Sequence, residues 1–150
     1  MTFSIREATP EDAGALHDLY YIHLDSPPDE AQDMAAWREK LARFAADPLY
    51  YVLVGETEGQ IVSSVTLVVI ESLLQNLRPY GVIEYVVTHA DFRNRHYATA
   101  LMNRACEIAE SHNCYKIMLY TGSKQDKTLR FYENCGFDRN EKTAFIRRYT

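Results

Sequence analysis

One stretch of 20 residues constrains the fold of this chain more than any other, the segment Val82–Leu101. It opens with an apolar, valine-rich run typical of a buried strand, interrupted by a single carboxylate, Glu84. Three basic side chains follow at Arg93, Arg95 and His96, and a helical pattern begins at once. A strand that feeds a basic turn at a helix N-terminus suits phosphate, because free backbone N–H groups and the helix dipole both face the anion. The segment therefore predicts a phosphate-binding strand–turn–helix unit.

The overall charge makes this basic turn more informative. The 150 residues carry a net charge of −5, so a basic cluster is not a product of the composition. The negative balance also argues against a general nucleic-acid-binding protein, which needs a broad basic face. No apolar run approaches the roughly 20 residues that a membrane-spanning helix requires. We therefore expect one domain over residues 1–150, with neither nucleic acid nor membrane as a partner.

The chain has three cysteines, Cys106, Cys114 and Cys135, and their spacing is not that of metal ligands. No histidine cluster has metal-ligand spacing either, so we expect no bound metal. The odd cysteine count and a charged N-terminal segment without an apolar leader predict reduced thiols in a cytoplasmic protein. The simplest interpretation of the thiols is that they pack as small apolar residues.

Hydrophobic periodicity divides the chain into helices and strands. Thr9 and Pro10 form a helix start, and Gly136 a helix stop. The segment 72–81 is expected to be a loop. Helices are expected over residues 10–23, 29–46, 98–113 and 126–134, and strands over residues 3–8, 50–56, 60–70, 81–88, 115–121 and 144–150. This alternation predicts a mixed α/β fold in which helices cover a sheet.

Three motifs, taken in order along the chain, resemble the GNAT superfamily of N-acetyltransferases. The opening IREATPEDAGAL resembles the first strand and helix of these enzymes. Their pyrophosphate-binding pattern is Arg or Gln, two residues, Gly, one residue, then Gly or Ala. Arg93 begins it, Ala98 fits it, and His96 stands where glycine is usual. Tyr132 precedes Gly136–Phe137 by the family spacing of four residues. The resemblance covers essentially the whole chain and implies an α/β (α+β) fold: a mixed, mostly antiparallel sheet with a splayed strand pair, flanked by helices.

Within the superfamily, the blocks IEYVVTHADFRNR, NCYKIML and RFYENCGF are similar to glucosamine-phosphate N-acetyltransferases. The chain departs from these enzymes at Tyr85, where an acid is common, and at His96. The resemblance implies transfer of an acetyl group from acetyl-CoA to a primary amine of a small molecule, with an amino sugar phosphate among the candidates. We expect direct attack in a ternary complex, because no cysteine is placed for an acyl-enzyme. A protein or peptide acceptor, and a CoA-binding module without turnover, are the alternatives.

The resemblance also implies which residues hold the coenzyme. The pantetheine arm would pair with the edge of the strand at residues 86–88, as extended peptide-like chains do. The turn would meet the pyrophosphate with backbone N–H groups, and Arg93 and Arg95 would add charge-assisted bonds unless they belong to a solvated surface turn. Gln125 stands where many relatives place an asparagine near the CoA arm. The expected coenzyme contacts are Val86, Val87, Thr88, Arg93, Asn94, Arg95, His96, Tyr97, Ala98 and Gln125.

Three residues are expected to carry the chemistry. Glu84 places a charge in an apolar strand, and as a general base it would take the proton of the attacking amine. The backbone N–H of Val86 would stabilise negative charge on the acetyl oxygen. Tyr132 would, by family analogy, protonate the leaving thiolate. The alternatives are an ion pair at the strand end for Glu84 and aromatic packing for Tyr132.

Contacts to the acceptor are expected from the first half of the chain. Arg78, in the loop before the strand of Glu84, is the candidate for binding an anionic group. The other candidates are Tyr80, Tyr20 and Asp25. Tyr20 follows helical spacing, so core packing is its alternative, and a solvated loop position is the alternative for Arg78. The last strand has an apolar start that would pair across subunits, which favours a homodimer.

Overall fold

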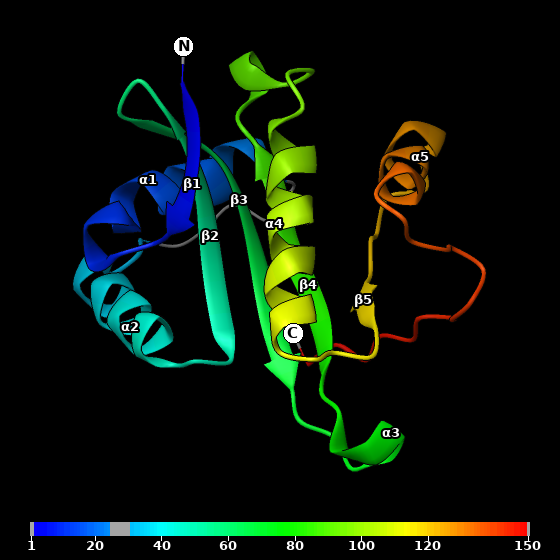
Figure 1. The fold of residues 1–150 in the computed structure, drawn as a ribbon. Coiled ribbons are helices and arrows are strands. Elements are labelled where there is room, and N and C mark those ends of the chain that lie inside the picture. The colour runs from blue at the N-terminus through cyan, green and yellow to red at the C-terminus, as the bar shows by residue number, and fades with distance from the viewer. Residues whose placement is uncertain (1, 25–30, 150) are drawn as a thin grey trace.

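A sheet of five strands in the order β1-β2-β3-β4-β5 organises the molecule, whose computed structural model describes residues 2–24 and 31–149 (Figure 1). All neighbouring strands are antiparallel except β4 and β5, which are parallel. The strands are β1 (Phe3–Glu7), β2 (Tyr50–Thr57), β3 (Gln60–Ile70), β4 (Tyr80–Thr88) and β5 (Ile117–Leu119). This arrangement confirms the mixed, mostly antiparallel sheet flanked by helices.

Helices precede, interrupt and follow the strands. The first helical stretch changes character along its length, from the 3-10 turn η1 through α1 to the π-helical segment η2. The helical elements are η1 (Pro10–Asp12), α1 (Ala13–Asp18), η2 (Leu19–His23), α2 (Met34–Ala46), α3 (Leu74–Leu77), η3 (Ala90–Phe92), α4 (Tyr97–Ser111) and α5 (Asp126–Asn134). No helix in the described ranges is both long and apolar enough to cross a membrane.

The two faces of the sheet bury separate apolar cores, because side chains alternate along each strand. The side chains on one face of the sheet pack against α4, whose Leu101 and Met102 are almost completely buried. The intervening residues, including Val52 and Val54 of β2, pack against α1 and α2 around Leu16. Figure 1 shows α4 lying along one face of the sheet. The central strands are therefore covered on both sides, which holds β4 firmly in place.

The pair β4 and β5 is splayed, as the resemblance implied. Residues 81–83 of β4 pair with Ile117–Leu119, whereas residues 84–88 have no partner on β5 in the described part of the chain. The expected strand at 115–121 is therefore short, because only three of its residues meet β4. Figure 1 shows the chain diverging from β4 beyond β5 and leading to α5. The opening between residues 84–88 of β4 and α5 is called the gap below.

The prediction of a last strand at residues 144–150 is wrong for residues 144–149, which form no regular structure; Thr150 lies outside the described residues. Phe145, Ile146 and Tyr149 are instead 92%, 72% and 86% exposed. A strand requires a neighbouring edge with which to exchange backbone hydrogen bonds. Within the described residues the sheet ends at β5 and does not include this segment.

Two smaller expectations also need correction. The second helix begins at Met34 rather than at residue 29, because Asp33 caps it by accepting hydrogen bonds from two backbone N–H groups. Residues 29 and 30 lie outside the described residues, and residues 31–33 are not helical. The expected loop at 72–81 contains the single turn α3, in which Gln75 and Asn76 adopt left-handed backbone conformations.

Candidate active site

A bulge in β4 sets the geometry at the centre of the site. The register of β4 against β3 shifts between Glu84 and Val87, which leaves Tyr85 and Val86 without register partners on β3. Tyr85 takes up the extra residue with a φ of 55°, a conformation that costs a non-glycine residue about 1 kcal/mol or more. Bulges of this kind re-aim groups beside active sites. The irregularity falls where the sequence analysis expected the backbone N–H of Val86 to act.

Glu84 and Tyr132 lie on the two sides of the gap, on β4 and α5 respectively. Burial raises the pKa of the Glu84 carboxyl above its ordinary value. Burial also raises the pKa of the Tyr132 phenol, and the charges of Cys135 and Glu84 raise it further. The two side chains are therefore close enough to influence each other. A carboxyl with raised proton affinity and a phenol that stays protonated are suited to act as base and acid.

The backbone at the end of α5 fixes the spacing between Tyr132 and the pair Gly136–Phe137. The backbone N–H groups of Cys135 and Phe137 donate to the carbonyl oxygen of Tyr132 at 3.0 and 3.1 Å. Gly136 makes this reversal with a φ of 97°, which glycine adopts without strain. The ring of Tyr132 also packs edge-to-face on Phe131, at 5.1 Å between centroids. The residue is thus both part of the core and held rigidly beside the gap.

The basic turn between β4 and α4 has the backbone geometry of an anion site. Asn94 and His96 both adopt left-handed conformations, with φ values of 63° and 64°, and His96 is the N-cap of α4. Alternation of left- and right-handed residues turns successive backbone N–H groups toward one concavity. The first N–H groups of α4 also lack partners within the helix. His96 therefore accepts the conformation usual for glycine and does not displace the helix start.

The two arginines of the turn have different contacts. Arg93 donates from Nε to the carbonyl oxygen of Thr88 and from Nη2 to that of His23, both at 3.2 Å. It therefore ties the turn to the end of β4 and to the π-helical segment η2. The guanidinium of Arg95 lies over the ring of Phe92, 5.1 Å from its centroid, and is exposed. Arg95 is consequently the better placed of the two to meet a phosphate.

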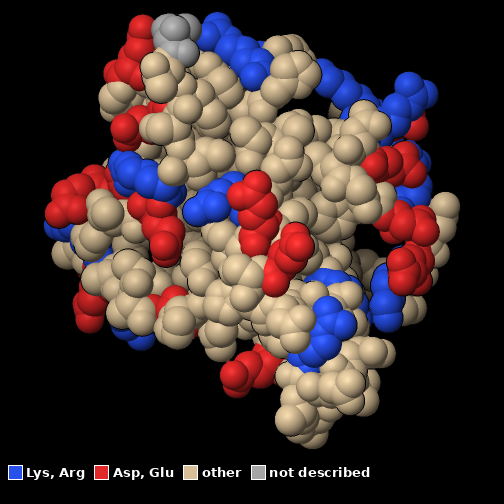
Figure 2. Space-filling view, viewed as in Figure 1, with Lys and Arg blue, Asp and Glu red and all other residues tan. Residues whose placement is uncertain are grey.

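Two flanking elements complete the expected coenzyme surface. The ring of Tyr97 stacks on that of Phe3 of β1, with 4.0 Å between the ring centroids and 3° between the ring planes, and this contact fixes the start of α4. Ala98 lies in the first turn of α4. Gln125 is exposed and is the N-cap of α5, across the gap. Figure 2 shows basic side chains gathered along the edge that holds the turn and the start of α5. A local basic edge on a chain of net charge −5 attracts anions to this place.

The strand edge expected to hold the pantetheine arm is open toward the gap. Val86, Val87 and Thr88 have no strand partner on the β5 side in the described ranges. On the opposite side, Ser63 of β3 donates from its hydroxyl to the carbonyl oxygen of Val87 at 2.9 Å. The segment is therefore fixed from one side and free on the other, as strand addition by an extended amide chain requires.

Tyr20 lies on the face of the sheet toward which Glu84 points, in the segment η2. Its ring centroid is 6.0 Å from that of Tyr85. Burial raises the pKa of the Tyr20 phenol, and hydrogen bonds with the hydroxyls of Ser64 and Thr66 partly offset that rise. This position fits the expected acceptor contact. Asp25, the neighbouring candidate, lies outside the described residues.

Sequence reasoning missed Tyr50, which joins this aromatic group from β2. Burial raises the pKa of its phenol, and the charges of Tyr85, Tyr20 and Glu84 raise it further. Its ring also stacks on that of Phe44 of α2, with 3.9 Å between the ring centroids. The signal that would have found it is the alternation of β2, since Tyr50 points to the same face as Val52, two residues on.

Arg78 and Tyr80 lie at the far end of β4, away from the basic turn. Arg78 donates to the carbonyl oxygens of residues 113 and 114, at 3.1 and 3.2 Å. Tyr80 packs edge-to-face on Tyr115. Glu84 follows Tyr80 by four residues, roughly 13 Å along an extended strand. The structure therefore uses this pair to hold the connection between α4 and β5, and does not bring Arg78 to the carboxylate.

A pair of histidines in ring contact was also missed, because its members are far apart in sequence. The rings of His23 and His89 lie 4.0 Å apart, and each Nδ1 accepts a backbone N–H, from Ala90 and Asp91 respectively. Burial lowers the pKa of His23, and the nearby charges of His89 and Arg93 lower it further. The pair joins η2 to the turn. Within the described residues, no group of three or more His, Cys, Asp or Glu is arranged to hold a metal.

Comparison with known proteins agrees with this geometry. Residues 16–137 match the acetyltransferase (GNAT) family. A glucosamine 6-phosphate N-acetyltransferase of Trypanosoma brucei brucei is 36% identical over 84 residues, 56% of this chain and 55% of that protein. One of Arabidopsis thaliana is 29% identical over 98 residues, 65% of this chain and 64% of that protein. The chain thus spans less than two thirds of the length of these curated relatives.

A solved structure gives a longer match. A protein of Agrobacterium tumefaciens str. C58 that carries a provisional acetyltransferase name is 35% identical and superposes with a TM-score of 0.87. The superposition covers 97% of this chain and 99% of that one.

Proposed function

Because this chain belongs to the GNAT family of acetyltransferases, we propose that it transfers the acetyl group of acetyl-CoA to the primary amine of an amino sugar. The observation that carries the proposal is the gap between β4 and β5. Glu84 and Tyr132 flank it and influence each other electrostatically, and the anion-binding turn stands at its end. A base, an acid and a phosphate site along one open strand edge are the parts that acyl transfer from a coenzyme thioester needs.

The residues around the gap fit the coenzyme. The open edge at residues 86–88 would pair with the amides of the pantetheine arm. The backbone N–H groups at the start of α4, held by the left-handed Asn94 and His96, would bind the diphosphate with help from Arg95. When bound, acetyl-CoA supplies an activated thioester at the level of the bulge.

The chain's own residues then have separate tasks. Glu84 takes the proton of the attacking amine, directly or through water, because only a neutral amine is a nucleophile. The N–H of Val86, released from ladder pairing by the bulge, donates to the oxygen on which negative charge develops. Tyr132 donates its proton to the departing thiolate, and its raised pKa keeps that proton in place until then.

The aromatic group beside Glu84 supports a sugar as the acceptor. Tyr20, Tyr50 and Tyr85 gather around the carboxylate, and flat aromatic faces pack against the apolar faces of sugar rings. The curated relatives above are named for glucosamine 6-phosphate, and the phosphorylated sugar is therefore the first acceptor to test. Arg78 is not placed to bind its phosphate, since it holds backbone carbonyls at the other end of β4.

One observation favours a peptide amine as a second candidate. Tyr85 is 53% exposed, which leaves the aromatic group open on one side. An extended chain would fit an open surface better than a closed pocket does. The acceptor panel below therefore includes a peptide with a free N-terminus.

The test is release of free thiol from acetyl-CoA in the presence of glucosamine 6-phosphate, glucosamine or the peptide. We expect an amino sugar to give the highest kcat/KM. Glu84→Gln should lower kcat by 10²- to 10⁴-fold, the usual contribution of a general base. Tyr132→Phe should lower it by a smaller factor, with coenzyme affinity by calorimetry within about twofold of wild type, well under the 1.4 kcal/mol of a tenfold change.

Matched controls keep the test specific. Glu58→Gln, in the turn between β2 and β3, and Tyr115→Phe remove the same chemical groups outside the gap and should leave kcat unchanged. Normal transfer by both Glu84→Gln and Tyr132→Phe would overturn the assigned roles. If the peptide is acetylated and neither amino sugar is, the acceptor is a peptide amine and the proposal of an amino sugar is wrong.

A further inference from the structure

The two histidines His23 and His89 meet where the segment η2 contacts the turn before α4, and we propose that they position this turn for the coenzyme only while both rings are neutral. Protonation of His23 would release the turn from η2 and weaken coenzyme binding. The inference rests on the proposed function, because it concerns the turn that would bind the diphosphate. Both histidines are positioning residues, which act through the backbone of the turn and not by touching the coenzyme.

Hydrogen bonds from two segments far apart in sequence converge on this contact. Nδ1 of His23 accepts the backbone N–H of Ala90 at 3.2 Å, a bond between residues 67 apart in the sequence. The carbonyl oxygen of His23 accepts from Nη2 of Arg93, also at 3.2 Å. Nδ1 of His89 accepts the N–H of Asp91 at 3.1 Å and so caps the short 3-10 turn η3. These bonds hold the start of the basic turn on η2.

A series of ring contacts extends from the histidines to the exposed arginine of the turn. The ring centroids of His23 and His89 lie 4.0 Å apart, and His89 packs edge-to-face on Phe92 at 5.3 Å. The guanidinium of Arg95 lies over the ring of Phe92, 5.1 Å from its centroid. The pair therefore supports the side chain proposed to meet the diphosphate as well as the backbone. Holding binding groups in their bound positions raises affinity, because less conformational entropy is lost on binding.

The segment η2 connects the same contact to the acceptor side of the site. Tyr20 precedes His23 by three residues in η2, and its ring centroid is 6.0 Å from that of Tyr85, the neighbour of Glu84 in β4. A tie between η2 and the turn therefore fixes the acceptor surface relative to the coenzyme surface. Such alignment matters, because a displacement of about 1 Å between reacting groups can slow a reaction about 100-fold.

The hydrogen bonds of the pair require neutral imidazoles. A neutral ring carries a single proton, so Nδ1 accepts a hydrogen bond only when that proton is on Nε2. A protonated ring has donors at both nitrogens and accepts nothing. Protonation of His23 would therefore oppose two donors, its own Nδ1–H and the N–H of Ala90. It would also place a positive charge beside Arg93.

The surroundings of His23 favour the neutral ring. Burial lowers the pKa of His23, the charges of His89 and Arg93 lower it further, and the charge of Asp91 opposes them. A group with a lowered pKa in the folded protein contributes stability above its ordinary pKa, and that contribution is lost as the pH falls through the lowered value. The ordinary pKa of histidine is about 6.5, so coenzyme binding should weaken below about pH 6.5.

The test is the affinity for CoA by calorimetry at about pH 8 and about pH 5.5, on either side of the ordinary histidine pKa. We expect the affinity of wild type to fall by about tenfold or more between them. His23→Asn keeps an acceptor oxygen near the place of Nδ1 but cannot gain a proton, so its affinity should change by less than about threefold. His23→Leu removes the acceptor and should bind about tenfold more weakly than wild type even at about pH 8. Binding is measured because Glu84 and the amine would add their own titrations to kcat.

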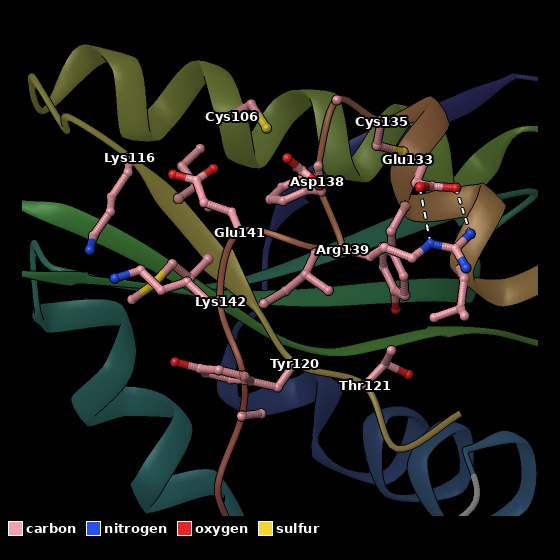
Figure 3. A pocket seen from close by; sticks show the side chains of 18 of the residues that line it. Cys106, Lys116, Tyr120, Thr121, Glu133, Cys135, Asp138, Arg139, Glu141 and Lys142 are labelled. Atoms are coloured by element: carbon pink, nitrogen blue, oxygen red, sulfur yellow. Dashed lines mark hydrogen bonds and ion pairs between the residues drawn. The ribbon is translucent and has the colours of Figure 1, made fainter. Parts of the chain in front are cut away.

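Two controls remove titratable groups elsewhere. His112→Gln changes a histidine at the other end of α4, where Nε2 lies 2.7 Å from the hydroxyl of Tyr51. Glu141→Gln removes a carboxyl from the cavity of about 720 Å³ beside β5, which is lined by residues between 106 and 144 (Figure 3). Both should keep the affinity and the pH dependence of wild type. His96 and the coenzyme phosphates are the same in every variant, so their effect cancels in the comparison.

Hydrogen exchange of the Ala90 amide, followed by NMR without coenzyme, tests the contact itself. At equal pH the amide should exchange about tenfold faster in His23→Leu than in wild type, and at the wild-type rate in His23→Asn. Equal rates in all three proteins would overturn the inference. So would a His23→Asn variant as pH-sensitive as wild type, or wild-type affinity of His23→Leu at about pH 8; these results would leave the proposed function standing. A wild-type protein that does not bind CoA at about pH 8 would contradict the proposed function and this inference together.

Discussion

The conformation of His96 gives the most direct test of the turn that we propose binds the diphosphate of the coenzyme. This residue is the N-cap of α4 and has φ 64° and ψ 18°, in the left-handed region. Such a conformation costs a non-glycine residue about 1 kcal/mol or more, and glycine adopts it freely. His96→Gly should therefore relieve native-state strain in the turn.

The net effect follows from two opposing contributions. Glycine gives the unfolded chain more freedom, which lowers stability by about 0.5–1 kcal/mol, and it removes strain of about 1–2 kcal/mol. His96→Gly should therefore raise the free energy of unfolding by about 0.5 kcal/mol. Ala100→Gly, one turn later in α4, raises the conformational entropy of the unfolded chain to the same extent but relieves no strain. It should therefore lower the free energy of unfolding by about 1 kcal/mol.

Thermal unfolding measures the difference between the two variants. In chains of this size 1 kcal/mol shifts Tm by about 2–4 °C, so the two Tm values should differ by about 3–6 °C. Equal losses of stability in both would refute the left-handed conformation. Coenzyme affinity of His96→Gly should stay within about tenfold of wild type, or 1.4 kcal/mol, because in our proposal backbone N–H groups and not the imidazole hold the diphosphate. A larger loss would assign the imidazole to the site.

Three further predictions concern the scaffold. Gly55→Ala should lower stability by about 1–3 kcal/mol in thermal unfolding, because its methyl would come within 2.4 Å of the ring of Phe3. Asp12→Asn should cost about 2 kcal/mol at neutral pH, since it breaks a paired carboxylate. Arg6 lowers the pKa of Asp12, so the difference from wild type should be full above the ordinary carboxyl pKa and fade as the pH falls through the lowered one. Arg78→Ala should destabilise the fold by about 1 kcal/mol and leave the KM for glucosamine 6-phosphate unchanged.

Each of these has an informative control. Gly14→Ala, where an added methyl meets nothing within 4 Å, should stabilise α1 by up to about 1 kcal/mol. A loss at Gly55 no larger than the change at Gly14 would contradict the close contact. A pH-independent deficit of Asp12→Asn would contradict the ion pair, and a raised KM for Arg78→Ala would return that residue to the acceptor site.

Local pattern was sufficient to predict the secondary structure of the continuous segment that carries most of the candidate site residues. The strand, turn and helix around Glu84 and Arg93 follow from apolar alternation, helix capping and charge, which are properties of neighbouring residues. The motif at Tyr132 was found through the family resemblance, and in the structure Gly136 lies in the turn that ends α5. Family membership agrees with both motifs.

What the sequence could not provide depends on contacts between distant segments. Nothing local indicates that Arg93 reaches the carbonyl oxygen of His23 or that Arg78 reaches residues 113 and 114. Tyr50 joins the aromatic group only because β2 aligns with β3 and β4. The C-terminal segment has a strand pattern, but a strand also requires a neighbouring edge, and the pattern alone does not show whether one is aligned with it.

Two groups of left-handed residues in the described part of the chain call for different explanations, and Glu58 and Asn113 belong to neither group. Tyr85, Asn94 and His96 lie within twelve residues, at the bulge of β4 and in the turn before α4. Strain of this kind persists only where the surroundings enforce it, and here the two cores on either face of the sheet hold β4 and α4 in place. The left-handed residues of α3 position nothing near the gap, and nothing in the structure explains them. Positive φ alone is thus no sign of function in this chain.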